Sequence, residues 1–488
     1  RGVMPRYLAA SAVLSHWIFA EAGVDMLCSE IGENIPCINM MIASNRGSAR
    51  AYQKPWMIDH STWWAPRGHA GELVSPREGH TPWCMFTSLL EAVMGGADFV
   101  QLEVDWAAYD ENYTLLPWGE ALKNLHALSG QIGVRGETLT PFAVVLGNDN
   151  GWPGVGWRIG DVRGAGLFDG MRHEFMQTRD ADLSLKIFDI FYPQFERCGW
   201  DPEYPGFLTE SPFGPLDIVP NNLSVDTYRR YRVLVALGYH RYTPELLDTW
   251  EQYVRAGGIL ICSDTAFRDE RECFVNPKYL EPLLGCVPDF RERKLLVLNQ
   301  PRGTLADVEG LLERGERIEW QHHYLHPVKL TQGHVVGRLN DVPYIIENRL
   351  GSGRVFFITG LNGVGSSAIR RGPEPFLYSN ILYYFLHSLN DHVGTGVSFK
   401  PWTGLDYILN RKTDGSLWLL VMNHNDMFYR RDATLRGYGP FSSLRIAAQG
   451  DWRKYDVGKE IPFVHKDDVV TWSFAMEPKS FVLFVFER

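Results

Sequence analysis

Pro55-Trp56-Met57-Ile58-Asp59 is a short apolar run that ends on a carboxylate, and it decides the fold. Two similar runs flank it along the chain, Val24-Asp25-Met26-Leu27-Cys28-Ser29-Glu30 and Ala97-Asp98-Phe99-Val100-Gln101-Leu102-Glu103. Each is followed by an amphipathic stretch long enough for a helix, which predicts alternating strands and helices around a parallel sheet. Carboxylates at the C-terminal ends of such strands are typical of (β/α)-barrel active sites.

The helices that accompany these strands are expected at 8–21, 35–52, 82–94 and 118–132. No strand is expected before the first helix, so the sequence is interpreted as starting near the fifth helix of a barrel. The front half of that barrel is then expected upstream of Arg1.

A second region has short, apolar, largely β-branched segments that are typical of buried parallel strands. They are expected at 140–147, 216–219, 231–237 and 258–262, with helices at 182–196, 244–255, 304–314 and 375–389 and a hairpin of 344–346 with 354–358. From Val397 onward the pattern alternates without helices, and Asp414-Gly415 marks a hairpin turn. We therefore predict three domains, at 1–136, 137–395 and 396–488, the last a β-sandwich.

Length, charge and cysteine content limit the classes of partner and environment that fit this chain. The chain has 488 residues, too many for one ordinary core, and a formal net charge of -10, which argues against nucleic acid or an anionic membrane as partner. No apolar run reaches the roughly 18 residues of a membrane span. The seven cysteines form no CxxC pair and are expected to be reduced and mostly buried. Two cellular locations are considered. The cytoplasm is slightly favoured, and a secreted or periplasmic location requires a signal sequence upstream.

Several segments carry a resemblance to a known family. Lys54-Pro55-Trp56-Met57-Ile58-Asp59-His60-Ser61, Arg77-Glu78-Gly79-His80 and Gly95-Gly96-Ala97-Asp98-Phe99-Val100 resemble the last two barrel strands of family 42 β-galactosidases and related clan A glycoside hydrolases. Ala256-Gly257-Gly258-Ile259-Leu260-Ile261 and Gly351-Ser352-Gly353-Arg354-Val355 are similar to parts of the domain that follows the barrel in those enzymes.

The resemblance implies a fold and an assembly. The fold is a (β/α)8-type TIM barrel portion, a flavodoxin-like or glutamine-amidotransferase-like α/β domain and a C-terminal β-sandwich. It also implies a carbohydrate substrate, no cofactor, and a homo-oligomer, with a trimer as its specific form. The family's nucleophilic Glu falls on Asp59. Its acid/base Glu belongs to the fourth barrel strand, so that residue is expected either upstream of this sequence or replaced by another carboxylate.

Glycoside hydrolysis needs two carboxyl groups about 5 Å apart for retention, or about 6.5–9.5 Å apart for inversion. Glu30 and Glu33 follow one predicted strand and Asp59 follows the next, so we name these three as catalytic candidates. In the alternative interpretation, Glu33 and Asn34 cap the next helix and Glu30 pairs with an arginine such as Arg46 or Arg50.

Aromatic and polar residues beside these strand ends are candidates for sugar contacts. They are His60, Trp63, Trp64, Glu103, Asp105 and Trp106; both tryptophans of the loop could equally bury it against the barrel. No metal is expected, because His60, His69 and His80 have no helical ligand spacing and the histidines of 321–326 suit a surface strand or a subunit contact.

Three functions remain. The first is a glycoside hydrolase with a carboxylate pair. The second is a non-catalytic carbohydrate-binding or assembly subunit derived from such an enzyme. The third is polysaccharide elimination with His60 as the base.

Overall fold

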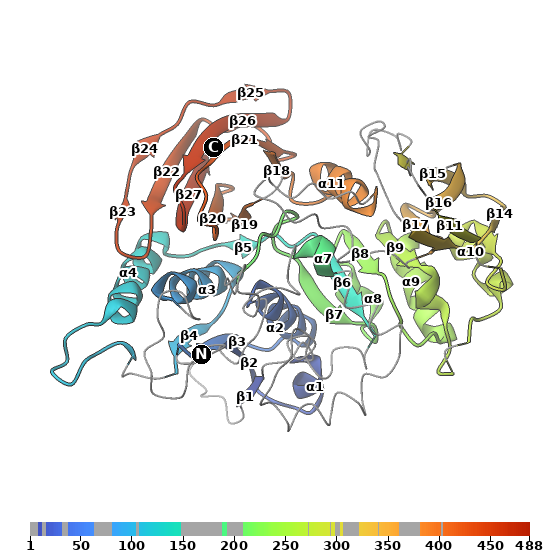
Figure 1. The fold of residues 1–488 in the computed structure, drawn as a ribbon, viewed down its shortest axis with the longest axis horizontal. Coiled ribbons are helices and arrows are strands. Elements are labelled where there is room, and N and C mark those ends of the chain that lie inside the picture. Colours follow the sequence, from blue (N-terminus) through green and yellow to red (C-terminus); the bar gives the residue numbers. More distant parts are fainter. Residues whose placement is uncertain are drawn as a thin grey trace.

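The computed structural model describes residues 8–11, 16–31, 38–62, 81–103, 107–147, 188–192, 208–271, 273–292, 294–297, 303–305, 322–339, 341–360, 381–401 and 404–488. Over these ranges the protein is a mixed α/β structure with three larger strand assemblies and two small two-stranded sheets (Figure 1). The predicted mixed α/β organisation is confirmed. No helix in the described ranges is long and apolar enough to cross a membrane.

The first assembly is a parallel sheet in the order β1-β2-β3-β4. Its strands are β1 (Leu8–Ser11), β2 (Met26–Ile31), β3 (Trp56–His60) and β4 (Phe99–Leu102), and its helices are α1 (His16–Glu21), α2 (Ile38–Tyr52), α3 (Pro82–Gly95) and α4 (Pro117–Ile132). The helix expected at 8–21 is wrong in its first part, because 8–11 form a strand beside β2. One face of the sheet packs against the helices in a shared apolar core that includes Leu27, Ile58 and Leu89.

Local sequence fixes the bounds of α3. The Thr81 hydroxyl accepts a hydrogen bond from the Cys84 amide at 3.2 Å, and Pro82 occupies the first turn, where its missing N–H costs nothing. Gly96 ends the helix with a φ of 104°, a left-handed conformation that favours glycine. The chain then turns directly into β4, which places Gln101 beside Asp59 of β3.

The second assembly has eight strands in the order β12-β15-β16-β17-β9-β8-β6-β7. Five strands are parallel, namely β6 (Phe142–Leu146), β7 (Asp217–Pro220), β8 (Val233–Ala236), β9 (Ile259–Ser263) and β17 (Gly353–Ile358). Their order is the 2-1-3-4-5 order of flavodoxin-like sheets. Three antiparallel strands extend it, namely β16 (Val342–Leu350), β15 (His334–Leu339) and β12 (Gly303–Leu305).

Helices and small sheets accompany this assembly. The helices are α7 (Phe188–Phe191), α8 (Val225–Tyr228), α9 (Pro244–Arg255), α10 (Glu281–Leu284) and α11 (Ile381–Val393). In the small sheets β10 (Cys286–Pro288) pairs with β14 (Val328–Leu330), and β11 (Lys294–Val297) pairs with β13 (His322–Leu325). The helix predicted at 304–314 is wrong at its start, where Gly303–Leu305 is a strand; 306–314 lie outside the described residues.

The third assembly is a pair of facing sheets with a shared core, the predicted sandwich. One sheet contains β18 (Val397–Lys400), β21 (Tyr429–Arg436), β26 (Val469–Met476) and β25 (Val464–Lys466). The other contains β23 (Tyr455–Asp456), β24 (Lys459–Glu460), β22 (Ser443–Gly450), β27 (Ser480–Glu487), β20 (Leu417–Asn423), β19 (Asp406–Arg411) and β5 (Glu137–Thr138). Trp472 of one sheet meets Phe484 of the other at a ring-centroid distance of 5.7 Å.

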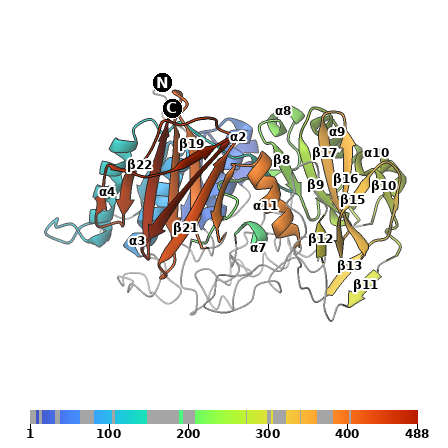
Figure 2. The same ribbon diagram turned by 90° about the horizontal axis from the view of Figure 1, so that it is seen from above.

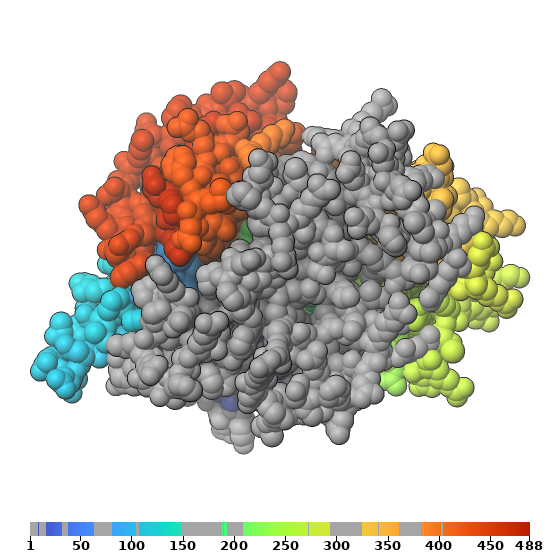
Figure 3. All heavy atoms as spheres, in the orientation of Figure 1, coloured from blue at the N-terminus to red at the C-terminus, as the bar shows by residue number. Residues whose placement is uncertain are grey.

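The assemblies pack on one another (Figures 1 and 2). The sandwich lies over α3 and α4, where Phe86 meets Phe481 at a centroid distance of 5.5 Å. Strand β5 pairs with β19, so the predicted boundary after residue 136 is followed at once by a sandwich strand. The segment 107–116 projects from the left edge in Figures 1 and 3, and its Tyr113 is 86% exposed.

Candidate active site at the ends of β2, β3 and β4

Three polar residues lie side by side across the parallel sheet. Glu30 of β2 is in register with Asp59 of β3, and Asp59 is in register with Gln101 of β4. Register partners on parallel strands point to the same face, and neighbouring strands are about 4.8 Å apart. The two carboxylates therefore stand next to each other on the face opposite the helices.

The same face continues toward the other end of the strands as a small apolar layer. Because side chains alternate along a strand, Cys28 and Met57 lie on the face that carries Glu30 and Asp59, and they are buried with Met26 in one cluster. Burial raises the pKa of the Cys28 thiol to about 12, and the charges of Asp59 and then Glu30 add to that rise. Both carboxylates thus act on one thiol, as expected if they converge.

Asp59 lies in a mixed environment. Burial raises the pKa of its carboxyl above the ordinary value, a hydrogen bond from the Gln101 side chain lowers it, and the charge of Glu103 raises it. Its Oδ1 atom is buried and has no hydrogen-bond partner in the described part of the chain. One oxygen is thus oriented by Gln101, and the other is left to a ligand or a proton.

Glu103 belongs to the same face at the exit of β4. Its side chain is exposed and its Oε2 accepts a hydrogen bond from the Ser61 hydroxyl. The Glu103 amide donates to the His60 carbonyl at 3.1 Å, and the Ser61 amide donates to the Ile31 carbonyl at 2.7 Å. These backbone bonds tie the exits of β2, β3 and β4 together, so the carboxylates are carried by a connected rim.

The structure separates His60 from this group. His60 is in register with Ile31 and Leu102, which contact the core shared with the helices, and its side chain is 0% exposed. It therefore lies on the face of β3 opposite Asp59. A base for polysaccharide elimination has to reach the substrate, and the buried His60 ring lies on the face that packs against the helices.

Other sequence-based candidates fall outside the described residues: Glu33, Trp63, Trp64, Asp105 and Trp106, together with His69 and His80. The arginines suggested as partners of Glu30 have another role. Arg46 and Arg50 pair with Asp217 of β7, at 2.7 and 2.9 Å. Gln101 was not among the sequence-based candidates, because a neutral amide carries no charge signal; its position two residues before Glu103 is the pattern that identifies it.

The histidine-rich stretch at 321–326 includes a buried member. His326 is 3% exposed, its Nε2 lies 3.3 Å from the Asp264 carboxylate, and its Nδ1 lies 2.8 Å from the Glu292 carbonyl oxygen. The expectation of a surface strand is therefore wrong for His326. Among the described residues no group of three or more His, Cys, Asp or Glu is placed to hold a metal.

No family model matches the sequence, and no curated protein matches it. The structure resembles glycoside hydrolases. A β-galactosidase from Rahnella sp. R3 matches with a TM-score of 0.59 and 13% identity, over 96% of this chain and 61% of its own. A catalytic mutant of a family 42 β-galactosidase from G. stearothermophilus has a TM-score of 0.56 and 15% identity, over 94% and 61%.

A different glycosidase shows the same likeness. An α-L-fucosidase from Paenibacillus thiaminolyticus has a TM-score of 0.52 and 11% identity, over 93% of this chain and 64% of its own. The chain thus spans less than two thirds of the length of each of these enzymes. At such identities the likeness shows a glycoside hydrolase-like fold.

Proposed function

We propose that this chain is a glycosidase that cleaves a glycosidic bond with Asp59 and Glu30 as its carboxylate pair. The observation that carries the proposal is the register of these two residues on adjacent strands. A strand spacing of about 4.8 Å is close to the roughly 5–5.5 Å between carboxyl groups in retaining glycosidases. The glycoside hydrolase-like fold supports the same reaction class.

In the proposed mechanism Asp59 is the nucleophile. Its oxygen attacks the anomeric carbon as the bond to the leaving oxygen breaks, and Glu30 gives that oxygen its proton. Water then cleaves the glycosyl ester with Glu30 as the base, which restores both groups. Repulsion between the adjacent carboxylates favours one shared proton, and the Gln101 hydrogen bond favours the ionised form of Asp59.

The remaining candidates have supporting roles in this proposal. Glu33 is the alternative acid, because it follows the same strand as Glu30. Glu103, Asp105, Trp63, Trp64 and Trp106 are proposed sugar contacts, since carboxylates bind hydroxyl groups and indoles stack on the apolar faces of sugar rings. A homo-trimer is proposed from the family resemblance, and light scattering at the monomer mass of 55.6 kDa would contradict it.

The first test is release of nitrophenol from aryl glycosides, including a β-D-galactoside and an α-L-fucoside. Asp59→Asn and Glu30→Gln should each lower kcat/KM by about 10²–10⁴-fold. The matched control is Asp226→Asn, which changes an exposed carboxylate in α8, outside the parallel sheet, and should leave turnover unchanged. Full turnover in both catalytic variants would refute the assignment.

The second test separates the roles of the two carboxylates. With azide present, Asp59→Gly should yield a glycosyl azide of inverted configuration, because azide replaces the nucleophile. Glu30→Gly should yield an azide of retained configuration, because azide then attacks the Asp59 ester. Exchanged products would reverse the roles, and sugar binding without turnover by the unaltered chain would favour the binding or assembly subunit.

A further inference from the structure

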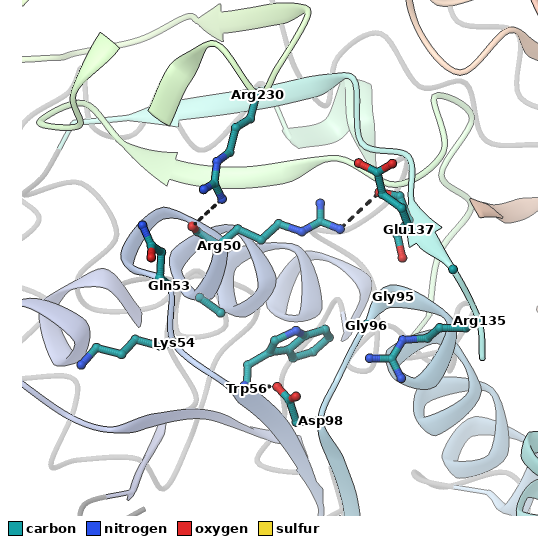
Figure 4. A pocket seen from close by; sticks show the side chains of 13 residues that line it. Arg50, Gln53, Lys54, Trp56, Gly95, Gly96, Asp98, Arg135, Glu137 and Arg230 are labelled. Atoms are coloured by element: carbon teal, nitrogen blue, oxygen red, sulfur yellow. Dashed lines mark hydrogen bonds between the residues drawn. The ribbon is translucent and has the colours of Figure 1, made fainter. Parts of the chain in front are cut away.

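A groove lies at the end of the parallel sheet opposite the candidate active site. It consists of two adjoining cavities of about 330 and 550 Å³, which share Arg50, Glu137, Thr138 and Arg230. Trp56, at the start of β3, and Asp98, just before β4, line the first cavity. We call this space the basal groove; Figure 4 shows its first cavity.

Cations dominate the lining of the basal groove. They are Arg50, Lys54, Arg135, Arg230, Arg232 and Arg411. The carboxylates in the lining are Asp98 and Glu137, and α2 and α3 end beside the groove with about half a negative charge each. Positive charge therefore exceeds negative charge by about three on a chain whose formal net charge is -10.

Some of these cations already have partners. Arg50 is 2.9 Å from Asp217, and Arg411 is 3.0 Å from Glu137. Arg232 donates to the Gly257 carbonyl at 2.7 Å, and Arg230 donates to the Arg50 carbonyl at 3.0 Å, in the last turn of α2. The last two bonds leave a full positive charge on each guanidinium.

Two other cations of the groove, Lys54 and Arg135, form neither ion pairs nor side-chain hydrogen bonds with the described residues. Within the described ranges, the exposed Arg230 has no ion pair. Arg135 is half-buried, and burial lowers the pKa of its guanidinium while the charge of Asp98 partly opposes this. Figure 4 shows Arg135 pointing toward the Trp56 indole, and Arg230 on the other side of the Arg50 side chain, pointing to the Arg50 backbone.

We propose that the basal groove binds small polyanions, ligands with two or more carboxylate, sulfate or phosphate groups. A guanidinium presents paired N–H donors that match such oxyanions, and a bound oxyanion would satisfy the donors of Arg135 and Arg230 that protein groups leave unused. The two adjoining cavities, of about 330 and 550 Å³, offer room for a ligand with several charged groups. This site is separate from the carboxylate pair and does not depend on glycosidase activity.

Isothermal titration calorimetry tests the proposal by measuring the binding of three probes to the full chain at low salt. The probes are tripolyphosphate, trigalacturonate and neutral maltotriose. Tripolyphosphate or trigalacturonate should bind, maltotriose should not, and added salt should weaken binding through charge screening. Binding of tripolyphosphate alone would assign a phosphorylated ligand, whereas binding of trigalacturonate would assign an acidic glycan. Absence of binding by both anions at millimolar concentration would overturn the proposal.

Variants locate the binding in the groove. Arg135→Gln and Arg230→Gln should each weaken binding by about tenfold or more, because each loses a charge-assisted contact. The matched control is Arg229→Gln, since Arg229 is exposed and pairs with Asp226 at 3.0 Å outside the groove. Asp98→Asn should strengthen binding by removing a negative charge. Equal affinity in Arg135→Gln and Arg229→Gln, with both folded by circular dichroism, would exclude the groove.

Discussion

At the scale of single residues, the chemistry of the candidate site depends on what surrounds Asp59. Its neighbours act in opposite directions: the Gln101 side chain lowers the pKa of the carboxyl, and Glu103 raises it. In the proposed mechanism Asp59 is a nucleophile and has to be ionised, so this balance would set the lowest pH at which the proposed reaction proceeds. Both influences come from β4 and its exit, but from two different side chains, so each can be removed by its own substitution.

The acid limb of the pH profile of kcat/KM should follow this balance. Glu103→Gln removes a like charge, lowers the pKa of Asp59 and should move the limb to lower pH. Gln101→Leu removes the stabilising hydrogen bond and should move it to higher pH. Titration of kcat/KM in both variants checks this, and shifts in the same direction would contradict the roles of these neighbours.

Sequence patterns locate Glu30 and Asp59 because both follow apolar, strand-like runs that end on carboxylates. They do not reveal which face of β3 carries His60, since His60 directly follows Asp59 and only the pleat separates the two. Nor do they reveal the partners of Arg46 and Arg50, because Asp217 lies more than 160 residues further along the chain. Contacts over such separations are set by the packing of whole elements.

A second carboxyl group is buried away from the candidate site. Glu91 of α3 is 6% exposed, and the Asn39 amide donates to it at 3.3 Å and to Asp406 of the sandwich at 2.8 Å. Burial raises the pKa of Glu91 well above its ordinary value, and Asp406 adds to the rise, although Arg46 opposes it. The protonated, uncharged form of Glu91 is therefore favoured where α2, α3 and β19 meet.

Stability should depend on pH through Glu91. Because the pKa is raised in the folded state, the stabilising contribution is complete below the ordinary value of 4.5 and decreases as pH rises toward the folded-state value. Glu91→Gln should therefore raise Tm at pH 7–8 and change it little near pH 4. The control is Glu120→Gln, on the exposed side of α4. A stabilisation by Glu91→Gln that is equal at both pH values would contradict this account.

At the scale of elements, α2 holds the first two assemblies together. It covers the parallel sheet on one side and meets β7 of the eight-stranded sheet on the other. Gly47 makes the close approach possible, since a Cβ atom there would lie 2.3 Å from the Ile218 carbonyl oxygen. No side chain fits between these two backbones.

Gly47→Ala should lower the free energy of unfolding by about 1–3 kcal/mol or more, because backbone atoms cannot yield as a side chain would. Gly130→Ala is the matched control in α4, where an added Cβ meets nothing within 4 Å. That change should stabilise the chain by about 0.5–1 kcal/mol, as alanine favours a helix over glycine. Denaturant unfolding of both variants checks the pair, and a neutral Gly47→Ala would contradict the close packing.

At the scale of the whole molecule, the buried ion group of Arg46, Arg50 and Asp217 joins the helical layer of the parallel sheet to the eight-stranded sheet. Arg46 is 2% exposed and Asp217 is 0% exposed, and the Tyr231 hydroxyl donates to Asp217 at 3.0 Å. Burial alone would raise the pKa of Asp217, but Arg50 and Arg46 lower it below the ordinary value. The two arginines thus favour the charged form of the buried carboxylate.

Asp217→Asn should destabilise the chain by about 3–5 kcal/mol near neutral pH, since it leaves two arginines without their counter-charge. The lowered pKa means that the stabilisation is present above the ordinary value of 3.8 and lost as pH falls. The deficit of the variant should therefore shrink in acid. Asp226→Asn, which breaks an exposed pair, should change stability by less than about 0.5 kcal/mol. Thermal unfolding from pH 3 to pH 8 tests both.

Most strands and long helices could be predicted because each has its own periodicity, and α9 has the predicted bounds of 244–255. Strand β1 was missed, since Leu8, Ala12 and Ile18 also fit a helical spacing and short apolar runs are ambiguous. Strand β5 was missed because two residues carry no pattern. The antiparallel extension β15-β12 depends on pairings that no local signal specifies.

Strand β5 also has a consequence for biosynthesis. Its hydrogen-bonding partner in β19 leaves the ribosome about 270 residues later, a delay on the order of 10–50 s at ordinary translation rates. Until then the backbone of Glu137 and Thr138 has no strand to pair with, so the part of the chain already synthesised cannot complete its native fold. Ribosome-bound chains stalled before β19 should be cleaved by protease near β5. Cleavage there should disappear in chains stalled after β19 has emerged, which would show that β5 stays unpaired until then.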